Sequence, residues 1–293
     1  MPTGPAPLRV GVAGAGPWAR LFHAPALAAH PEVELAAVWA RREEAAVEVA
    51  APYGALASTS FDAFLGAVDA VAFAVPPDVQ AELAVPAARA GRALLLEKPL
   101  ALDLDAAQRL ADVVADTGVP TQMVLTWRYA PEVRQLLAGL SGAEVLGGRG
   151  WFLTGGFLGG MFATPWRLRE GPLSDLGPHV VDLLDAALGP VVGIRAHGHP
   201  HRWVGLLLEH ESGAVSEASL TAYSRLEPPR AGVEVHTTGG VLEVDTTGVS
   251  GSAAPVLVDE FVATARSGRP HALDAARGLH LQRLLARAAA DLG

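Results

Sequence analysis

The chain has 293 residues, half of them hydrophobic, and its 31 acidic and 22 basic side chains give a formal net charge of −9. This length suits two domains of roughly 100–200 residues each, and the negative charge argues against a nucleic-acid partner because phosphates repel an acidic surface. The chain has no cysteine, which excludes disulfide bonds and thiolate chemistry.

The N-terminus lacks the positively charged start and the apolar core of a signal peptide. No stretch of the sequence reaches the roughly 20 apolar residues that a membrane-spanning helix needs. We therefore expect a cytoplasmic protein with no membrane partner.

The first 125 residues alternate short apolar stretches with helical ones. Strands are predicted at Arg9–Ala13, Val33–Trp39, Asp69–Val75, Ala93–Leu96 and Val119–Leu125. Helical patterns lie between them, and the clearest is the amphipathic stretch Leu104–Thr117. Short apolar strands separated by helices predict a parallel sheet with helices on both faces. We expect an α/β fold, with a doubly wound Rossmann domain over residues 1–125.

The second half of the chain changes character, because predicted strands follow one another with few helices between them. The candidate strands are Val145–Leu153, Val191–His197, Trp203–Glu209, Ala214–Thr221, Gly232–Thr237 and Val241–Asp245. Helices are expected at Pro178–Ala187, Val256–Ser267 and Asp274–Asp291. This order predicts an α+β domain with an open, mostly antiparallel sheet over residues 126–293. Its C-terminal helices can pack back on the first domain.

A glycine-rich turn joins the first predicted strand to the first helix: Gly14-Ala15-Gly16, with Ala19 three residues later. The glycines let the backbone approach a pyrophosphate, and the N-terminus of the following helix then faces the negative charge. A tight strand–helix turn with no ligand is the alternative. The position of the turn between a strand and a helix favours a dinucleotide-binding site.

The second predicted strand ends without the acid that commonly binds the ribose hydroxyls of NAD. Ala40 stands there, and Arg41 and Arg42 follow it. A guanidinium group pairs with a phosphate in a bidentate fork, so we expect NADP as the preferred cofactor, with NAD as the other possibility. The alternative is that both arginines begin a solvated helix and pair with its glutamates, Glu43, Glu44 or Glu48.

Lysine occurs once in this chain, since 21 of the 22 basic residues are arginine and the other is Lys98. It follows the fourth predicted strand in Glu97-Lys98-Pro99, as Pro76 follows the third. Ligands of open α/β sheets bind beyond the carboxyl ends of the strands, which places Lys98 at the cofactor cleft. A compact, titratable ammonium can approach a hydroxyl group, whereas a broad guanidinium stays charged. Lys98 is therefore a candidate catalytic residue.

Farther along the chain, Asp175, His179 and Asp182 are spaced i, i+4 and i+7, so they share one face of a predicted helix. Ser174 is a candidate N-cap of this helix. A histidine flanked by carboxylates can serve as general acid and base, because imidazole titrates near neutral pH. On spacing alone, an exposed polar helix face is an equal alternative. We take Asp175 and His179 as candidate catalytic residues.

Together these motifs resemble the Gfo/Idh/MocA oxidoreductases, the group of glucose–fructose oxidoreductase and inositol dehydrogenase. The resemblance rests on Gly14–Ala19, Glu97-Lys98-Pro99 and Asp175–Asp182, and it extends from Leu8 to the last predicted helix. It implies hydride transfer between nicotinamide and a secondary alcohol or ketone of a sugar, cyclic polyol or related carbonyl compound. It also implies a homodimer or homotetramer that associates through the open sheet. No metal site is expected.

The resemblance implies roles for individual residues. Lys98 would polarise the reacting oxygen, His179 would take or return the hydroxyl proton, and Asp175 would orient the substrate or tune His179. The implied cofactor-binding residues are Gly14, Gly16, Pro17, Trp18, Ala19, Ala40, Arg41, Arg42, Pro76, Gln80, Glu97 and Lys98. The implied substrate-binding residues are Arg128, Trp166, Arg167, Asp175 and His179.

Some positions depart from the family pattern. Gln80 stands where the family often has histidine, Glu170-Gly171-Pro172 replaces a run of glycines, and Thr126-Trp127-Arg128 keeps only the arginine of a common segment. These positions belong to the expected pocket wall, so they leave the substrate open. Two rival functions remain on this fold. One is a dinucleotide-binding sensor without catalysis, and the other is an NAD-dependent glycosidase or an imine or enone reductase.

Overall fold

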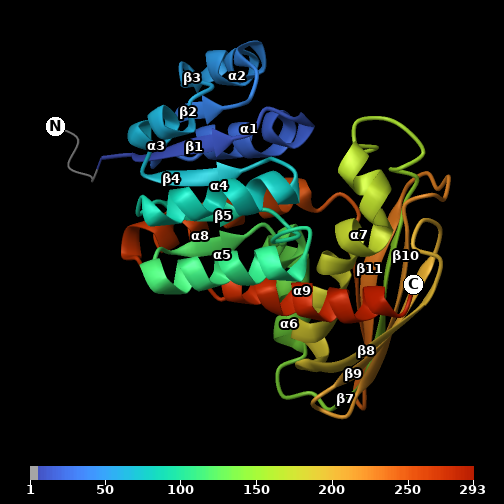
Figure 1. Cartoon of the computed structure of the whole chain (residues 1–293). Coiled ribbons are helices and arrows are strands. Elements are labelled where there is room, and N and C mark those ends of the chain that lie inside the picture. The colour runs from blue at the N-terminus through green and yellow to red at the C-terminus, as the bar shows by residue number, and fades with distance from the viewer. Residues whose placement is uncertain (1–5) are drawn as a thin grey trace. The chain divides into compact units, whose positions relative to one another are not determined.

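The computed structural model of the chain describes residues 6–293 and divides into two compact units, each built around its own sheet (Figure 1). Unit 1 contains the residues up to Val124 together with Ala254–Leu279. Unit 2 contains Leu125–Ala253 and His280–Gly293. Within residues 6–293, no helix combines the length and the hydrophobicity that a bilayer-spanning segment requires.

Unit 1 is built on a six-stranded parallel sheet in the order β3-β2-β1-β4-β5-β6. Its strands are β1 (Leu8–Ala13), β2 (Val33–Trp39), β3 (Leu56–Ser58), β4 (Ala70–Phe73), β5 (Ala93–Leu96) and β6 (Thr121–Met123). The strand order reverses between β1 and β4, and such a switch point opens a ligand crevice at the carboxyl ends. The predicted doubly wound sheet is confirmed. The sequence pattern missed β3 because a strand of three residues is too short to show an apolar run or an alternation of apolar and polar residues.

Helices cover both faces of this sheet (Figure 1). They are the π-helix η1 (Ala19–His23), α1 (Ala24–Ala28), α2 (Glu43–Ala50), the 3₁₀-helix η2 (Ala51–Tyr53), α3 (Phe61–Ala67), α4 (Pro77–Arg89) and α5 (Leu104–Thr117). Local signals fix the ends of α5. The Asp103 side chain accepts a hydrogen bond from Ala106 N at 2.7 Å, and Gly118 ends the helix with a φ of 67°.

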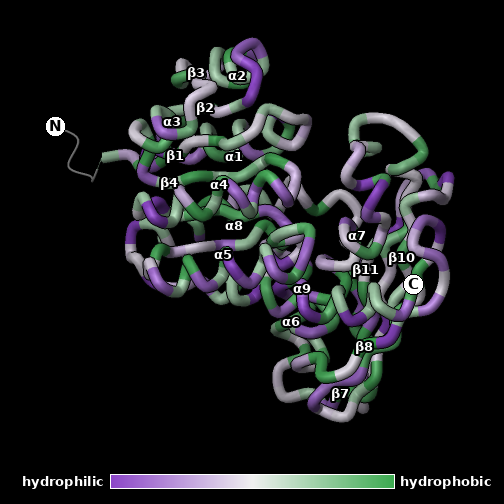
Figure 2. Tube along the Cα trace, in the orientation of Figure 1, coloured by the Kyte–Doolittle hydropathy of each residue, from purple (hydrophilic) through white to green (hydrophobic). Residues whose placement is uncertain are grey.

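The centre of the unit 1 core is formed by β4 and β5. Every residue of β4 is fully excluded from solvent, and β5 is buried along its whole length. Figure 2 shows hydrophobic colours through this middle part of the sheet. A strand that is buried on both faces reads as a continuous apolar run, which is why the sequence pattern located both strands.

The segment Ala254–Leu279 belongs to unit 1 because it binds β6, the last strand of the sheet. The carbonyl of Leu273 accepts a hydrogen bond from Met123 N at 2.6 Å. The Gln122 amide donates to the carbonyl of Leu257 at 2.9 Å. This segment contains most of α8 (Ser250–Ser267) and the start of α9 (Ala275–Ala290).

A surface ion pair in unit 1 joins Arg9 of β1 to Asp69, the residue before β4, at 2.7 Å. The hydrogen bond from Arg9 holds the pKa of the Asp69 carboxyl below its ordinary value of 3.8, while burial opposes that shift. The pair therefore stabilises the fold above the ordinary pKa, and this contribution is lost as the pH falls through the lowered pKa.

Asp69→Asn should accordingly lower the Tm slightly at neutral pH, because exposed ion pairs contribute little. As the pH falls below the ordinary pKa and through the lowered one, the difference in Tm between the two proteins should shrink. Thermal unfolding followed by circular dichroism over a series of acidic pH values checks this. A loss of Tm that stays the same at every pH would contradict the ion-pair explanation.

Unit 2 is built on a second six-stranded sheet in the order β12-β11-β7-β10-β9-β8. Its strands are β7 (Val145–Leu153), β8 (Val191–Gly198), β9 (Val204–His210), β10 (Val215–Thr221), β11 (Arg230–Thr237) and β12 (Gly240–Asp245). Strands β7 and β10 pair in parallel, and the other neighbours pair antiparallel. The predicted open, mostly antiparallel sheet is confirmed. Two short helices that the pattern missed precede it: η3 (Thr126–Tyr129) and α6 (Pro131–Gly139).

The long helix α7 (Pro165–Leu188) packs on one face of this second sheet. Gly150 of β7 makes the approach possible, because a Cβ atom there would lie 2.5 Å from a methyl group of Val180. Gly177, within α7, allows a similarly close approach to α9, because a Cβ atom there would lie 2.9 Å from a methyl group of Leu285. Side chains on this side of α7 are therefore held in fixed positions.

The start of α7 differs from the sequence prediction. The sequence placed a helix at Pro178–Ala187 with Ser174 as a candidate N-cap, whereas helical residues begin at Pro165 and Ser174 lies inside the second of two helical segments. The two segments meet in a kink at Gly171, whose φ of 76° is not helical. Its missing side chain leaves room for the carbonyl of Pro200, a contact that no local sequence pattern reveals.

Candidate functional site

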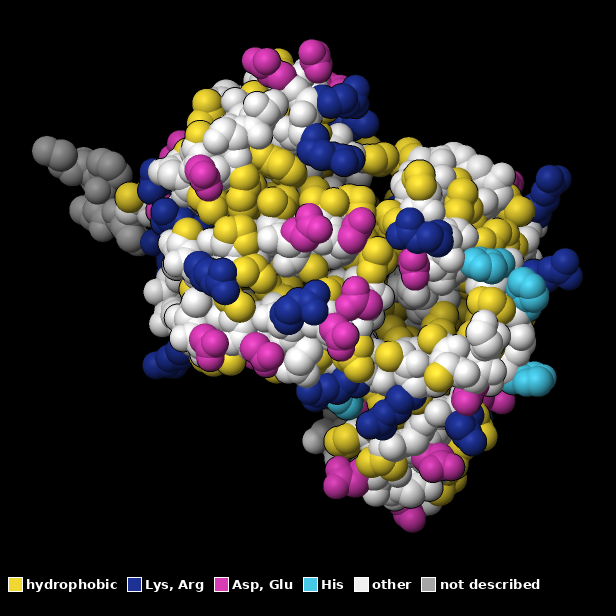
Figure 3. Space-filling model, in the orientation of Figure 1, with side chains coloured by type: hydrophobic (Ala, Val, Ile, Leu, Met, Phe, Trp, Pro, Cys, Tyr) yellow, Lys and Arg dark blue, Asp and Glu magenta, His cyan; other side chains and the backbone are white. Residues whose placement is uncertain are grey.

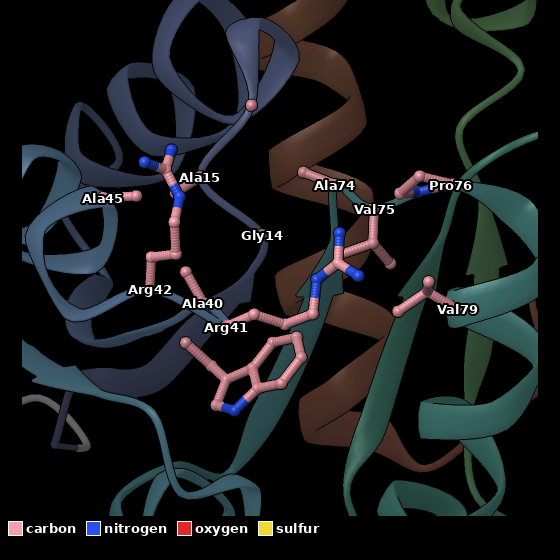
Figure 4. A pocket seen from close by; sticks show the side chains of 12 residues that line it. Gly14, Ala15, Ala40, Arg41, Arg42, Ala45, Ala74, Val75, Pro76 and Val79 are labelled. Carbon is pink, nitrogen blue, oxygen red and sulfur yellow. The ribbon is translucent and has the colours of Figure 1, made fainter. Parts of the chain in front are cut away.

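The carboxyl ends of β1, β2 and β4 surround a cavity of about 540 Å³ in unit 1 (Figure 4). The cavity is lined by Gly14, Ala15, Gly16, Trp39, Ala40, Arg41, Arg42, Ala45, Ala74, Val75, Pro76 and Val79. Six of the residues expected to bind a dinucleotide are among these: Gly14, Gly16, Ala40, Arg41, Arg42 and Pro76. The sequence interpretation missed the other six, most of which directly flank the same strand ends.

The two glycines of the first turn, Gly14 and Gly16, differ in what a side chain would meet at each position. Gly14 has a φ of 129°, and a Cβ atom there would overlap the carbonyl oxygen of Ala74, so the fold itself requires it. At Gly16 a Cβ atom would meet nothing within 4 Å, and its φ is not in the left-handed region. Gly16 therefore leaves an open stretch of backbone at the cavity, which fits the close approach of a pyrophosphate.

Arg41 and Arg42 supply the positive charge of the cavity. In Figure 4, Arg42 extends toward Ala15 and Arg41 toward Val75. Neither guanidinium forms a hydrogen bond or an ion pair within residues 6–293. The pairing with glutamates of the same helix is not observed for either arginine.

The charge around this cavity is uneven. Two arginines and no carboxylate are among the residues that line it. Glu48 of α2 is not among the lining residues, and its carboxylate binds Arg20 at 2.6 Å. Figure 3 shows dark blue basic side chains gathered beside α2, with acidic ones at its outer end. The cavity can therefore attract an anion by charge as well as by shape.

Glu97 lies at the carboxyl end of β5, and two side chains bind its carboxylate. Its Oε1 accepts hydrogen bonds from Trp18 Nε1 at 2.7 Å and from His23 Nε2 at 2.8 Å. Trp18 also stacks on Phe22, with ring centroids 4.5 Å apart. The sequence interpretation named Trp18 and Glu97 but missed the buried His23. No local pattern links His23 to Glu97, which follows it by 74 residues.

Lys98 follows Glu97 in the turn after β5, where its side chain is half-buried. The peptide bond between Lys98 and Pro99 is cis. Of the other residues expected to bind the cofactor, Pro17 is half-buried and Ala19 is fully buried at the start of η1. Gln80 is fully buried on α4, and its amide binds the backbone of the turn that contains Lys98.

Helix α7 carries a buried row of ionisable side chains in unit 2. Asp175, His179 and Asp182 are 6%, 8% and 1% exposed, so they do not form the exposed polar face that spacing alone allowed. Arg167 Nε lies 3.1 Å from Asp175 Oδ2. Arg128 Nη1 binds both carboxylate oxygens of Asp182, at 3.2 and 3.3 Å. Each of the two carboxylates thus has an arginine beside it, as buried charges require.

Aromatic rings surround His179 and Arg167. The imidazole of His179 stacks on Trp127 with centroids 5.3 Å apart, and the ring of Phe152 lies 6.3 Å away. The guanidinium of Arg167 lies over the Trp166 ring at 4.8 Å. Packing of this kind fixes an imidazole in place, and an imidazole held in this way can serve as a general acid or base.

The candidate residues fall into two groups, one in each unit. Unit 1 contains the cavity and Lys98, and unit 2 contains the substrate-binding candidates Arg128, Trp166, Arg167, Asp175 and His179. Among residues 6–293, no cluster of histidine and acidic side chains could hold a metal ion.

The chain is similar to known oxidoreductases in sequence. Residues 8–124 match the model of an oxidoreductase family with an NAD-binding Rossmann fold. The chain is 28% identical to dTDP-3,4-didehydro-2,6-dideoxy-alpha-D-glucose 3-reductase of Streptomyces violaceoruber, over 90% of this chain and 76% of that protein. It is 34% identical to inositol 2-dehydrogenase of Rhizobium meliloti, over 42% of this chain and 38% of that protein.

A solved structure matches the whole chain. The crystal structure of GenD2 from gentamicin A biosynthesis in complex with NAD has a TM-score of 0.87 and 24% sequence identity. The match covers 100% of this chain and 97% of that chain. At this level of identity the likeness concerns the fold.

Proposed function

Because the chain belongs to the Gfo/Idh/MocA oxidoreductases, we propose that it oxidises or reduces a secondary alcohol or ketone with NAD(P). The substrate class is a sugar, a cyclic polyol or a related small carbonyl compound, in keeping with the names of the relatives. The observation that carries the proposal is the open backbone at Gly16 in an arginine-lined cavity at the strand ends. When bound, the nicotinamide accepts or donates the hydride.

The catalytic roles are assigned to residues of this chain. The ammonium of Lys98 polarises the reacting oxygen, and the imidazole of His179 takes or returns the proton of the hydroxyl. Asp175, beside Arg167, orients the substrate and stabilises the charged imidazole. Proton transfer of this kind contributes about 10²–10⁴-fold to a rate. The stacked ring of His179 supports this assignment, because a fixed base does not have to be oriented during the reaction.

A substrate panel tests the proposed reaction. Sugars, inositols, nucleotide sugars and small ketones are offered with either dinucleotide, and NAD(P)H absorbance is followed. At least one of them should give steady turnover. A protein that binds the dinucleotide but turns over none of them would support the sensor alternative. Cleavage of a glycoside without net change in absorbance would support a glycosidase.

We propose further that NADP is the preferred cofactor. The support is the charge of the cavity wall, where Arg41 and Arg42 follow Ala40 and no lining residue carries a carboxylate. The additional phosphate of NADP would bind these guanidinium groups, and NAD offers them only ribose hydroxyls.

Replacement of Arg41 and Arg42 by alanine should therefore lower kcat/KM for NADPH by about 10- to 100-fold, since hydrogen bonds to charged groups contribute about 1.5–3 kcal/mol. The kcat/KM for NADH should change little, because NADH lacks the additional phosphate. The matched control is Arg109→Ala, which removes an exposed arginine from α5. A wild-type enzyme that clearly prefers NADH would rule out the proposed preference.

We also propose that two copies associate through the sheet face of unit 2 that lies opposite α7. Leu207 and Val215 are 49% and 47% exposed, and they line a shallow hollow of about 400 Å³ that crosses several strands. Exposed apolar side chains grouped on a sheet mark an interaction surface. Sedimentation velocity should give a dimer or larger oligomer, and Leu207→Arg should shift it toward monomer. A monomeric wild type at high concentration would contradict the proposal.

A further inference from the structure

Gln80, for which the family resemblance implied a cofactor contact, is fully buried in unit 1 on the first turn of α4. Its side-chain amide binds the backbone of the turn after β5. Oε1 accepts a hydrogen bond from Glu97 N at 2.8 Å. Nε2 donates to the carbonyls of Glu97 at 2.8 Å and Leu100 at 3.1 Å, and the carbonyl of Pro99 lies 3.4 Å away. One amide therefore holds the backbone on both sides of Lys98.

Few side chains can replace a glutamine in this position. The turn presents one N–H group and several carbonyls inside the protein, and such buried groups need partners. A primary amide offers one acceptor and two donors, which matches this set. A neutral histidine offers only one of each, and methionine, which has a similar length, offers neither donor nor a strong acceptor.

The side chain next to Lys98 is fixed as well. Glu97 accepts hydrogen bonds from Trp18 and from His23, and His23 is only 1% exposed. Backbone and side-chain bonds thus hold the residue before Lys98, and Gln80 also holds the residues after it. These contacts hold the backbone from which the Lys98 side chain leaves the turn.

We propose that Gln80 is a positioning residue that determines, through the backbone of residues 97–100, where the Lys98 ammonium lies. The importance of this position for turnover rests on the proposed function, in which Lys98 is catalytic. A displacement of about 1 Å in a catalytic group can cost on the order of 100-fold in rate. The loss of the amide should therefore affect the chemical step more than cofactor binding.

The first experiment reports on Lys98 without any turnover. Because Lys98 is the only lysine in the sequence, protein grown with ¹⁵N-lysine gives one labelled backbone amide peak. Gln80→Met should shift or broaden this peak. The matched control is Gln122→Met, since Gln122 is equally buried in unit 1 and donates to the carbonyl of Leu257 at 2.9 Å. It should leave the Lys98 peak in place.

The second experiment separates binding from catalysis. Gln80→Met should lower kcat by roughly 10- to 100-fold while KM for the dinucleotide changes by less than about threefold. Gln122→Met should change neither. Gln80→His keeps one donor and one acceptor, so it should recover part of kcat and a Lys98 peak closer to that of wild type. This milder variant also serves if Gln80→Met does not fold.

The outcomes distinguish this proposal from the proposed function. If Gln80→Met or Gln80→His leaves both the Lys98 peak and kcat unchanged, Gln80 does not position Lys98. If the Gln80 and Gln122 variants move the peak equally, the effect is general destabilisation and the proposal is also overturned. If wild type turns over no substrate, the proposed function fails, yet the position of the peak still decides what Gln80 does.

Discussion

Replacement of Lys98 by arginine is expected to lower kcat/KM by about 10²–10⁴-fold, although the positive charge is kept. The guanidinium group is planar and broad and stays charged at any working pH, whereas the ammonium is compact and can share a proton with a hydroxyl. Lys98 is half-buried in a turn whose backbone Gln80 binds, so the turn cannot easily adjust to a larger group.

The measurement is kcat/KM for the best substrate of the panel, followed by NAD(P)H absorbance. Arg109→Lys is the control, because it makes the reverse exchange on the exposed face of α5 and should leave activity unchanged. Dinucleotide affinity, measured by protein fluorescence, should stay within about threefold of wild type in Lys98→Arg, since the loss concerns the transition state. Full activity in this variant would remove Lys98 from the mechanism.

The two glycines of the first turn should respond oppositely to the same substitution. Gly16→Ala should fold with a Tm close to that of wild type, because a Cβ atom there meets nothing within 4 Å. A bound pyrophosphate would occupy that space, and one excess methyl group in a packed contact costs about 1–3 kcal/mol. Dinucleotide affinity should therefore fall by about 10- to 100-fold.

Gly14→Ala should instead unfold at a clearly lower temperature. The φ of 129° is unfavourable for alanine, and the new methyl group would overlap the carbonyl of Ala74. A strained φ costs about 1–3 kcal/mol, and the overlap adds to this. Thermal unfolding and calorimetric titration with NADPH and NADH measure both variants. Unchanged affinity in Gly16→Ala would mean that the dinucleotide does not bind at this turn.

Local patterns predicted the parts of the site in which neighbours in sequence are neighbours in space. The Gly14–Gly16 turn, Ala40–Arg42 and the turn at Lys98 were located in this way, because each directly follows a short strand of mainly apolar residues. The strand order could not be read from the sequence. The rule that ligands bind at the carboxyl ends of the strands was nevertheless enough to place these three segments at the same edge of the sheet.

Contacts between residues that lie far apart in the sequence could not be predicted from local patterns. The resemblance implied that Gln80 contacts the cofactor, and no local pattern revealed that its side chain binds backbone groups beginning 17 residues later. The bonds of His23 to Glu97 and of Arg128 to Asp182 span 74 and 54 residues. The kink of α7 at Gly171 was missed for the same reason, since the carbonyl of Pro200, which a side chain at Gly171 would overlap, belongs to a distant segment.

The buried row on α7 has a thermodynamic consequence for the evolution of this protein. Asp175, His179 and Asp182 occupy interior positions next to fully buried residues such as Val180 and Leu183, where apolar side chains would usually be more favourable. A single substitution of Asp175 or Asp182 would remove the carboxylate beside Arg167 or Arg128, and breaking a buried ion pair is strongly destabilising. Only changes that replace a carboxylate and its arginine together can gain stability at these positions. Thermostabilising single substitutions in unit 2 are therefore expected to accumulate outside this row, which leaves the catalytic candidates in place.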